Sequence, residues 1–453
     1  MRRLLAIAFA LTAATIGLSP PSSPLLGVVV DALTGKPVGN AIVTVDGAET
    51  RTDDRGTFLA SELGASTVRV RAHGYRRTEV PVDTVKRPPA EIRLVPVRPK
   101  ALYLSVYGIG NRTLREAALE LIDTTELNAL VIDVKADRGL IGYPSAIALA
   151  EQAGAQRVIT MPDLRGLLST LRQRGIYTIA RIVVFKDDPL ATARPDLAVR
   201  RRDGSIYRDR EALAWTDPHK AEVRAYNIAV AREVAAAGFD EIQFDYARMP
   251  DATGLVYCEP DTLQNRVAAI DGFLREARTA LVPYNVFLAI DIFGYVCWNP
   301  DDTRIGQQLE RIGDVVDYIS PMLYPSSFQF GIPGYRNPVE HPYEIVHRSL
   351  QRAVERTGLA PVRFRPWLQA FPDYAFGGRS FTGGEVRAQI TAADDIGTNG
   401  WMLWNPHNRY SRADVTVTDA AMSAYSSAPA ERPTKCVGAG DCTDATPLMN
   451  RVR

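Results

Sequence analysis

Apolar runs of strand length alternate with longer helix-like stretches from about residue 100 to residue 425. Some of the runs, such as 177–185, are almost continuously apolar, as expected for parallel strands covered on both faces. Strands that alternate with helices indicate a parallel sheet with helical crossovers. We find eight such runs, at residues 102–106, 129–134, 177–185, 241–246, 286–292, 318–323, 365–369 and 401–404.

Helical stretches lie between these runs, and their apolar residues recur every three to four positions. We predict helices at residues 113–122, 161–174, 220–237, 263–281, 304–312, 343–355 and 384–396. Eight strands with intervening helices over residues 100–425 predict an α/β fold, the (β/α)8 TIM barrel. A doubly wound open sheet is the alternative, but no Gly-rich dinucleotide fingerprint follows the first strand.

The preceding segment, residues 25–97, has a different pattern, in which short runs with period-two alternation are separated by Gly, Asp and Pro. This pattern predicts a small N-terminal antiparallel β-sandwich domain. Three motifs stand out in it: Gly27…Asp31…Thr34-Gly35, Thr52-Asp53…Gly56…Phe58, and Ala72…Gly74-Tyr75. They resemble the carboxypeptidase regulatory-like, prealbumin-like domain. The resemblance implies a fold and no chemistry.

The N-terminus has the features of an export signal. Met1-Arg2-Arg3 is basic, and the apolar run from Leu4 to Leu18 is too short to span a bilayer comfortably. Prolines crowd the expected cleavage position, so residues 1–24 are read either as a signal peptide or as an uncleaved N-terminal anchor. We expect a secreted, periplasmic or envelope-associated protein. Residues 426–453 are read as a flexible C-terminal tail.

Several classes of function are disfavoured by composition and motifs. Lys and Arg total 53 against 52 Asp and Glu, so no long-range field gathers nucleic acid or an anionic membrane. The 5 histidines show no metal-ligand spacing, which argues against a zinc enzyme. Neither a nucleophile elbow nor a phosphate-binding loop occurs. We therefore expect no cofactor and no metal.

Carboxylates stand near the ends of three of the predicted strands. These are Asp133, Asp245 and Asp291. In a TIM barrel the active site lies at the carboxyl ends of the strands. A charge at such a place is costly to desolvate unless it has a partner or a function. The three aspartates are therefore candidate catalytic residues, and ion pairing with Arg181 or Arg248 is the structural alternative.

The strand-end motifs also resemble those of a known family. They occur in order as Asp133-Val134-Lys135, Phe244-Asp245-Tyr246-Ala247-Arg248-Met249-Pro250, Asp291-Ile292-Phe293-Gly294, Ser320-Pro321-Met322-Leu323-Tyr324-Pro325 and Gly400-Trp401-Met402-Leu403-Trp404-Asn405. Together they resemble a bacterial family of glycoside hydrolase-like TIM-barrel proteins of uncharacterised function. Ala247 departs mildly from the family pattern, where a bulkier apolar residue is common. The resemblance implies a fold and a carbohydrate substrate.

Glycoside hydrolysis requires two carboxyl groups that flank the scissile bond. Because neighbouring strands lie about 4.8 Å apart, carboxyls on them can meet this spacing. We predict Asp245 as nucleophile or electrostatic stabiliser and Asp291 as acid/base, with Asp133 as the reserve for either role. Aromatic, cationic and amide side chains at the same ends are candidate substrate-binding residues: Lys135, Arg181, Tyr246, Arg248, Tyr324, Trp367, Gln369, Trp404 and Asn405.

The chain has 4 cysteines, a number compatible with an oxidising compartment. Cys258 and Cys297 follow the fourth and fifth predicted strands and are a candidate disulfide that would brace the two loops. Cys436 and Cys442 are a second candidate in the tail. The alternative is that all are free thiols.

Taken together, these patterns predict an exported glycoside hydrolase-like enzyme that acts on a polysaccharide or oligosaccharide by a two-carboxylate mechanism without a metal. The leading alternative is a non-catalytic barrel of the cell envelope that binds glycan. A lyase or transglycosylase on the same fold is the second.

Overall fold

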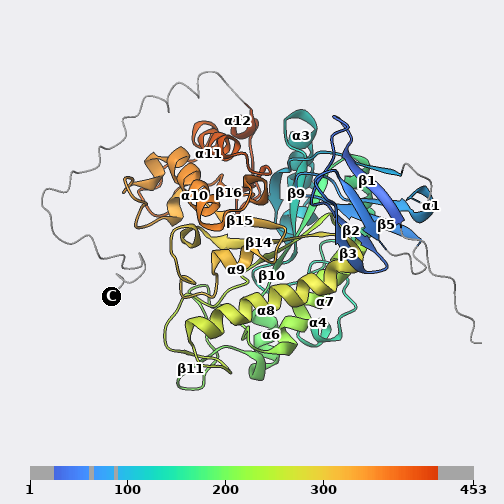
Figure 1. Ribbon diagram of the computed structural model, residues 1–453. Coiled ribbons are helices and arrows are strands. Elements are labelled where there is room, and N and C mark those ends of the chain that lie inside the picture. Colours follow the sequence, from blue (N-terminus) through green and yellow to red (C-terminus); the bar gives the residue numbers. More distant parts are fainter. Residues whose placement is uncertain (1–24, 61–65, 86–89, 417–453) are drawn as a thin grey trace, which may run out of the picture.

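A closed barrel of eight parallel strands forms the larger part of the molecule (Figure 1), and it confirms the predicted TIM barrel. The computed structural model describes residues 25–60, 66–85 and 90–416. The strands follow the barrel in the order β10-β12-β14-β15-β16-β17-β8-β9. Their bounds are β8 Lys100–Leu104, β9 Ala129–Lys135, β10 Tyr177–Val183, β12 Glu241–Asp245, β14 Phe287–Phe293, β15 Tyr318–Met322, β16 Trp367–Gln369 and β17 Trp401–Trp404.

Helices surround this barrel, and their apolar faces pack on the outward side chains of the strands in one large buried cluster. The main ones are α3 Arg112–Thr124, α5 Leu164–Gln173, α7 Ala221–Ala237, α8 Leu263–Leu281, α10 Pro342–Thr357 and α11 Gly383–Ile396. Shorter helices are α2 Val106–Gly110, α4 Ala148–Gln152, α6 Asp188–Ala193, α9 Leu309–Gly313 and α12 Arg412–Val415.

The helix predicted at residues 304–312 is mostly wrong. Thr303 and Arg304 have φ values of 54° and 57°, and Gly306 has a φ of 82°. Three residues in the left-handed region within four positions are incompatible with a continuous right-handed helix. The helical turn α9 therefore begins only at Leu309.

The N-terminal part consists of two small sheets packed face to face. One has the order β4-β1-β7 and the other β3-β2-β5-β6. Their apolar side chains share a separate buried core. All strand pairs are antiparallel except β1 with β7, which run parallel. The bounds are β1 Leu25–Asp31, β2 Ile42–Val45, β3 Ala48–Arg51, β4 Thr57–Ala60, β5 Thr67–Arg71, β6 Thr78–Pro81 and β7 Glu91–Leu94, with the helical turn α1 Val82–Val85 after β6.

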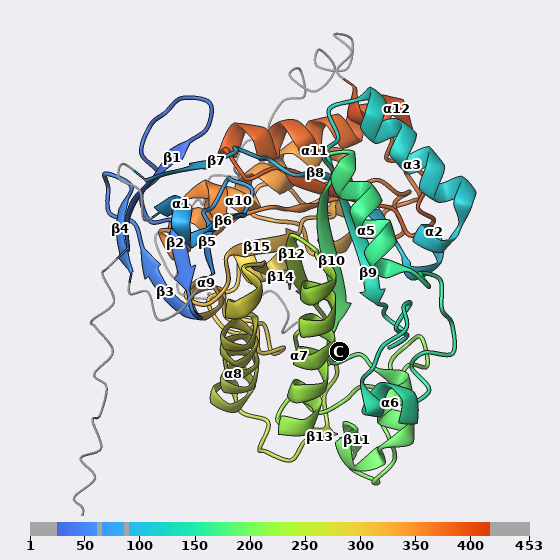
Figure 2. The same ribbon diagram turned by 90° about the vertical axis from the view of Figure 1, so that its right-hand side faces the viewer.

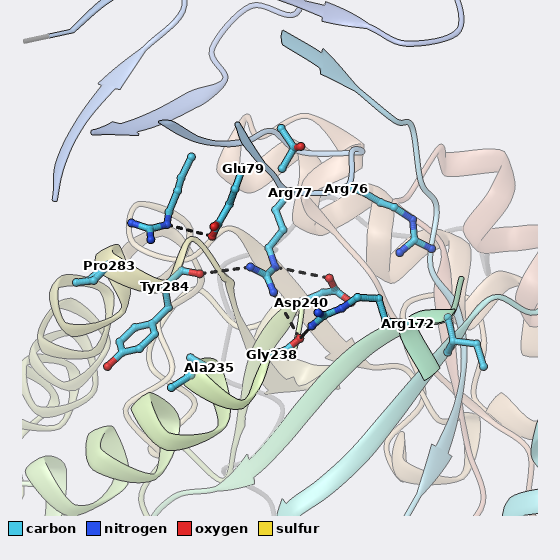
Figure 3. Close-up of a pocket in the computed structure, with 13 residues that line it drawn as sticks. Arg76, Arg77, Glu79, Arg172, Ala235, Gly238, Asp240, Pro283 and Tyr284 are labelled. Atoms are coloured by element: carbon cyan, nitrogen blue, oxygen red, sulfur yellow. Dashed lines mark hydrogen bonds and ion pairs between the residues drawn. The ribbon is translucent and has the colours of Figure 1, made fainter. Parts of the chain in front are cut away.

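This sandwich covers the amino ends of the barrel strands (Figure 2). The Gly74 amide donates to the hydroxyl of Tyr318, the first residue of β15, at 3.1 Å. Arg77 donates to the carbonyl of Phe239, just before β12, at 2.9 Å. A cavity of about 520 Å³ lies at this junction, where Arg77 and Arg172 donate to backbone carbonyls and Arg77 also lies near Asp240 (Figure 3). The carboxyl ends of the strands therefore remain uncovered by the sandwich.

A buried ion pair lies inside the amino end of the barrel. Arg365 Nη1 lies 2.7 Å from both carboxylate oxygens of Glu241, and both side chains are 0% exposed. The hydroxyl of Tyr177 donates to the same carboxylate at 2.9 Å. Burial raises the pKa of Glu241, and the Arg365 guanidinium opposes this rise. The two charges are thus desolvated together, and removing either side chain would leave the other as a buried charge without a partner.

A long excursion after β10 forms a lobe at the carboxyl side of the barrel (Figure 2). It carries α6 and the strand β11 Arg200–Arg201, which pairs antiparallel with β13 Leu255–Val256 from the loop after β12. Neither β11 nor β13 was predicted, because a two-residue strand has no periodicity to detect. The lobe places the loops after β10 and β12 beside each other.

Candidate active site

Arg181 lies at the centre of three carboxylates near the carboxyl ends of the strands. Its Nη1 donates to Asp133 Oδ1 at 2.6 Å and its Nε donates to Asp245 Oδ2 at 2.9 Å. Its Nη2 also donates to Asp245. Asp291 Oδ2 lies 3.9 Å from the same Nε. The structure thus brings together the three aspartates that the sequence singled out, on β9, β12 and β14.

The separation of Asp245 and Asp291 is limited by their shared neighbour. Because both Oδ2 atoms approach the same Nε, they are no further apart than the sum of 2.9 and 3.9 Å. Carboxyl groups of glycosidases lie about 5 Å apart in retaining enzymes and about 6.5 to 9.5 Å apart in inverting ones. This geometry is compatible with action on one glycosidic bond.

Asp291 is in an environment that favours its neutral form. Its Oδ1 accepts a hydrogen bond from Trp367 Nε1 at 2.8 Å, while its buried Oδ2 has no hydrogen-bond partner among the described residues. Burial raises the pKa of Asp291 well above its ordinary value, and the nearby Asp245 carboxylate raises it further. Two neighbouring carboxyl groups that cannot both ionise easily are the usual basis of an acid/base pair.

Asp133 differs from Asp291 because both of its carboxylate oxygens accept hydrogen bonds. Its Oδ2 accepts a hydrogen bond from the hydroxyl of Tyr103 at 2.6 Å, and its other oxygen is bonded to Arg181. Burial raises the pKa of Asp133 to about 6, and the Arg181 charge opposes the rise. Both oxygens are therefore occupied, as expected for a residue that orients Arg181.

The residue after Asp245 has an unusual backbone. Tyr246 has a φ of 50°, which is costly for a bulky side chain by about 1–3 kcal/mol. In this conformation its amide donates to Asp245 Oδ1 at 2.5 Å. Its ring lies beside Trp215 and Arg248, with centroid distances of 5.6 and 5.0 Å. This backbone conformation thus holds the Asp245 carboxylate through the amide and places the Tyr246 ring beside Trp215 and Arg248.

Half-buried aromatic rings border the cluster. Trp404 stacks on Tyr103 with ring centroids 4.0 Å apart, and the Arg181 guanidinium lies 4.9 Å from the Trp404 ring. Tyr324 packs edge-on against Phe371 at 5.5 Å. The aspartates and Arg181 are only 1–3% exposed beneath these rings. Trp404 and Tyr324 are therefore the aromatic side chains placed to meet a ligand here.

The expectation that Lys135 contacts a ligand is wrong. Its Nζ lies 2.8 Å from Asp187 Oδ2 and donates to the carbonyl of Val183 at 2.6 Å, and the side chain is 0% exposed. The cause is an irregularity in the pairing of β9 with β10. Arg181 pairs with Asp133, but Ile182 pairs with Lys135, so that one extra residue shifts Lys135 to the outer face.

Three other predicted binding residues serve the barrel itself. Trp367 is fully buried and donates a hydrogen bond to Asp291, so it positions that carboxyl group and is no exposed platform. Gln369 is also buried, because its amide bonds Ser326 and the carbonyl of Phe371. Asn405 donates to the carbonyl of Ala370 at 2.6 Å and caps the loop after β17. All three residues shape the site. The side-chain N–H groups of Trp367 and Gln369 are already bonded within the protein.

The disulfide predicted between Cys258 and Cys297 is absent, and both are free thiols. Cys297 lies in the 3-10 turn Gly294–Cys297 and is buried in the barrel–helix core, where burial raises its thiol pKa to about 12. Cys258 is exposed, and its amide is bonded to Asp217. Sequence position after neighbouring strands does not make two side chains face each other. Cys436 and Cys442 lie outside the described residues.

Sequence reasoning missed Tyr103, Lys186 and Trp215, which touch Asp133 or Tyr246. Period-two alternation along β8 would have found Tyr103, since Ala101 and Tyr103 both face the barrel interior. Lys186 and Trp215 come from a loop whose path has no such signal.

Two further findings concern the described residues only. None of their helices is both long enough and apolar enough to cross a bilayer. Among the same residues, no three His, Cys, Asp or Glu side chains are grouped so that they could hold a metal ion.

A closed (β/α)8 barrel with a carboxylate cluster at the carboxyl ends of its strands places the protein in the class of TIM-barrel proteins whose candidate active site lies at those ends. Residues 101–410 match the family model described as "Putative glycosyl hydrolase domain", and the chain belongs to that family. No curated protein matches the sequence significantly.

The chain is similar to several solved structures, and the first of those that follow agrees with its fold. The glycoside hydrolase domain of PgaB (BpsB) from Bordetella bronchiseptica is 15% identical, with a TM-score of 0.52, and the match covers 72% of this chain and 100% of that one. A hypothetical protein from Ruminiclostridium thermocellum is 34% identical over 42% of this chain and 96% of its own, with a TM-score of 0.37. The β-amylase catalytic domain from Paenibacillus polymyxa is 12% identical over 72% and 97%, with a TM-score of 0.47.

Proposed function

We propose that the protein is an exported glycoside hydrolase that cleaves a polysaccharide by a two-carboxylate mechanism centred on Asp245 and Asp291. The membership in a glycosyl hydrolase family supports the reaction class. The basic and apolar N-terminus supports export to the periplasm, the envelope or the medium. A polymeric glycan is the substrate that an exported enzyme of this class would meet.

The observation that carries the proposal is the pairing of two unlike carboxyl groups around Arg181. Asp291 is buried with one oxygen free of hydrogen bonds, which suits a neutral acid that donates a proton to the glycosidic oxygen. Asp245 accepts hydrogen bonds from Arg181 and from the Tyr246 amide, which suits an anion. In this mechanism Asp245 attacks the anomeric carbon or stabilises its positive charge. Asp133 acts through Arg181 as a positioning residue.

The pH dependence of cleavage tests the role of Asp291. A general acid must be protonated, so kcat/KM should fall as pH rises through its pKa, and this limb should lie above the ordinary aspartate value of about 4. Trp367→Phe removes the hydrogen bond that stabilises the Asp291 carboxylate, so the limb should move to higher pH. The matched control is Trp401→Phe, whose ring lies in the barrel–helix core and should leave the limb in place. A limb that Trp367→Phe does not move would remove Asp291 from this role.

Near-complete burial of the aspartates favours one second candidate, a barrel that binds glycan without cleaving it. In that case the three carboxylates and Arg181 form a structural network only, and affinity depends on Trp404 and Tyr324.

Reducing-end release from a broad panel of polysaccharides separates the candidates. Hydrolysis predicts new reducing ends from at least one polymer without ultraviolet-absorbing products, whereas a lyase would produce such products. Glycan-array binding that Trp404→Ala abolishes, with no reducing ends from any bound polymer, would favour the non-catalytic barrel.

A further inference from the structure

A cavity of about 560 Å³ lies between the lobe after β10 and the loop that follows Asp245 at the carboxyl end of β12. Lys186, Tyr207, Trp215, Tyr246 and Arg248 are among the residues that line it. Tyr246 connects the two places, because its amide is bonded to Asp245 while its ring lines the cavity. Tyr246 is therefore a common neighbour of the cavity and of the aspartate cluster.

Arg248 is a half-buried cation of this cavity, and two aromatic rings pack against it. Its guanidinium carbon lies 5.1 Å from the Trp215 ring and 5.0 Å from the Tyr246 ring. Its Nη1 donates to the carbonyl of Met249 at 2.9 Å. It forms no ion pair with any carboxylate in the described part of the chain. The side chain is half-buried, so its remaining N–H groups stay accessible.

The other inner cations of the cavity are neutralised. Lys186 lies 2.8 Å from Glu211 and 3.3 Å from Asp209, and it is buried. Arg208 is paired with Asp188. At the rim, the exposed residues Arg210 and Asp251 carry opposite charges. Among the described residues Arg210 also has no ion pair, but it is exposed, whereas the Arg248 guanidinium is held beside the Trp215 and Tyr246 rings.

The interdomain cavity of Figure 3 differs in this respect. There Arg77 donates to the Phe239 carbonyl and lies 3.6 Å from Asp240, and Arg172 donates to the Gly238 carbonyl. Arg77 joins the sandwich to the barrel, and Arg172 is bonded within the barrel, which leaves Arg248 as the stronger candidate for ligand recognition.

We propose that the cavity lined by Tyr246 and Arg248 is a subsite for a carboxylate-bearing sugar, so that the substrate is a polysaccharide containing uronic acid units. A guanidinium packed on aromatic rings keeps the N–H groups of its edge free, and that edge matches a carboxylate with two parallel hydrogen bonds. The aromatic rings reduce the number of conformations that Arg248 must lose on binding. This inference rests on the proposed function for its context, but its binding test does not require cleavage.

Calorimetric titration of the full chain carrying Asp245→Asn tests the subsite, since that variant binds without turnover. The probes are tetrasaccharides of galacturonate, of mannuronate and of hyaluronan, each compared with its methyl ester. At least one acid should bind, and its ester at least about tenfold more weakly, because esterification removes the charge. Adding Arg248→Met to this variant should lower its affinity for the acidic tetrasaccharide by a similar factor. Arg248→Lys should lower that affinity by less.

Arg348→Met is the matched control, because Arg348 is exposed on α10 and lies 5.1 Å from the Tyr335 ring. The affinity of this control variant for the acidic tetrasaccharide should stay within about twofold of that of the Asp245→Asn protein. Acids that bind no better than their esters, or unchanged affinity in the folded Arg248→Met protein, would overturn the inference. Reducing-end release by the unmodified chain is scored separately. Cleavage of neutral polymers alone would leave the proposed function standing, and acid binding without cleavage would leave the subsite standing.

Discussion

Asp245→Asn should lower the rate of glycan cleavage by about 10²- to 10⁴-fold while ligand binding survives. An amide can neither attack the anomeric carbon nor offer a full negative charge to it, so the transition state loses its electrostatic partner. Asparagine keeps nearly the volume of the aspartate, and its carbonyl still accepts a hydrogen bond in place of Asp245 Oδ1 or Oδ2. The loss should therefore fall mainly in kcat.

The measurement is kcat and KM on the best substrate of the polysaccharide panel, together with a thermal melt. Asp54→Asn, an exposed aspartate in the sandwich, is the matched control and should leave both constants unchanged. A drop in melting temperature is expected in Asp245→Asn as well, since Arg181 loses one of its two closest anionic partners. A folded Asp245→Asn protein with full activity would exclude Asp245 from the chemistry.

Arg365→Met should reduce the free energy of unfolding by about 3–5 kcal/mol, because it leaves Glu241 buried without its cation. Of the two side chains that donate hydrogen bonds to this carboxylate in the parent protein, only Tyr177 would remain as a donor. Removing both charges with Glu241→Gln and Arg365→Met together should cost less than Arg365→Met alone, since no charge then remains unpaired. Urea unfolding followed by circular dichroism measures all of these variants.

The loss of unfolding free energy caused by Arg365→Met should depend on pH. Without the guanidinium, the pKa of Glu241 in the folded state rises further above its unfolded value, so the folded state binds the proton more tightly. Stability relative to the parent should therefore fall as pH rises from the unfolded pKa through the folded one, and recover on acidification. Arg93→Met, which breaks an exposed pair with Glu91, should cost no more than about 1 kcal/mol at any pH. An equal loss of unfolding free energy in Arg365→Met and in Arg93→Met would contradict this account.

The eight strands were predictable because each is an apolar run bounded by turn residues, and runs of that kind are buried on both faces only in a parallel sheet. The aspartates were predictable because a carboxylate in such a run is costly to bury unless it has a partner or a function, and each of them lies near the carboxyl end of its strand. The helix predicted at 304–312 failed where Thr303 and Arg304 adopt left-handed conformations, which their side chains do not signal.

The details of the site depended on features with no local pattern. One extra residue between Asp133 and Lys135 reverses the direction of the lysine, and only the pairing with β10 reveals it. The cavity around Arg248 requires Trp215 and Tyr246 to meet across a loop of unpredictable path. In physical terms, alternation and burial specify which residues face inward, whereas long-range packing decides which of them touch.

The position of the sandwich also sets the orientation in which the enzyme would work. It occupies the amino ends of the barrel strands, and the chain enters it from residue 25. A protein held to a surface through its N-terminus would accordingly turn Asp245, Asp291 and the Arg248 cavity outward, away from the point of attachment. A glycan would then reach the carboxyl ends of the barrel strands from the side opposite the sandwich, which occupies the amino ends.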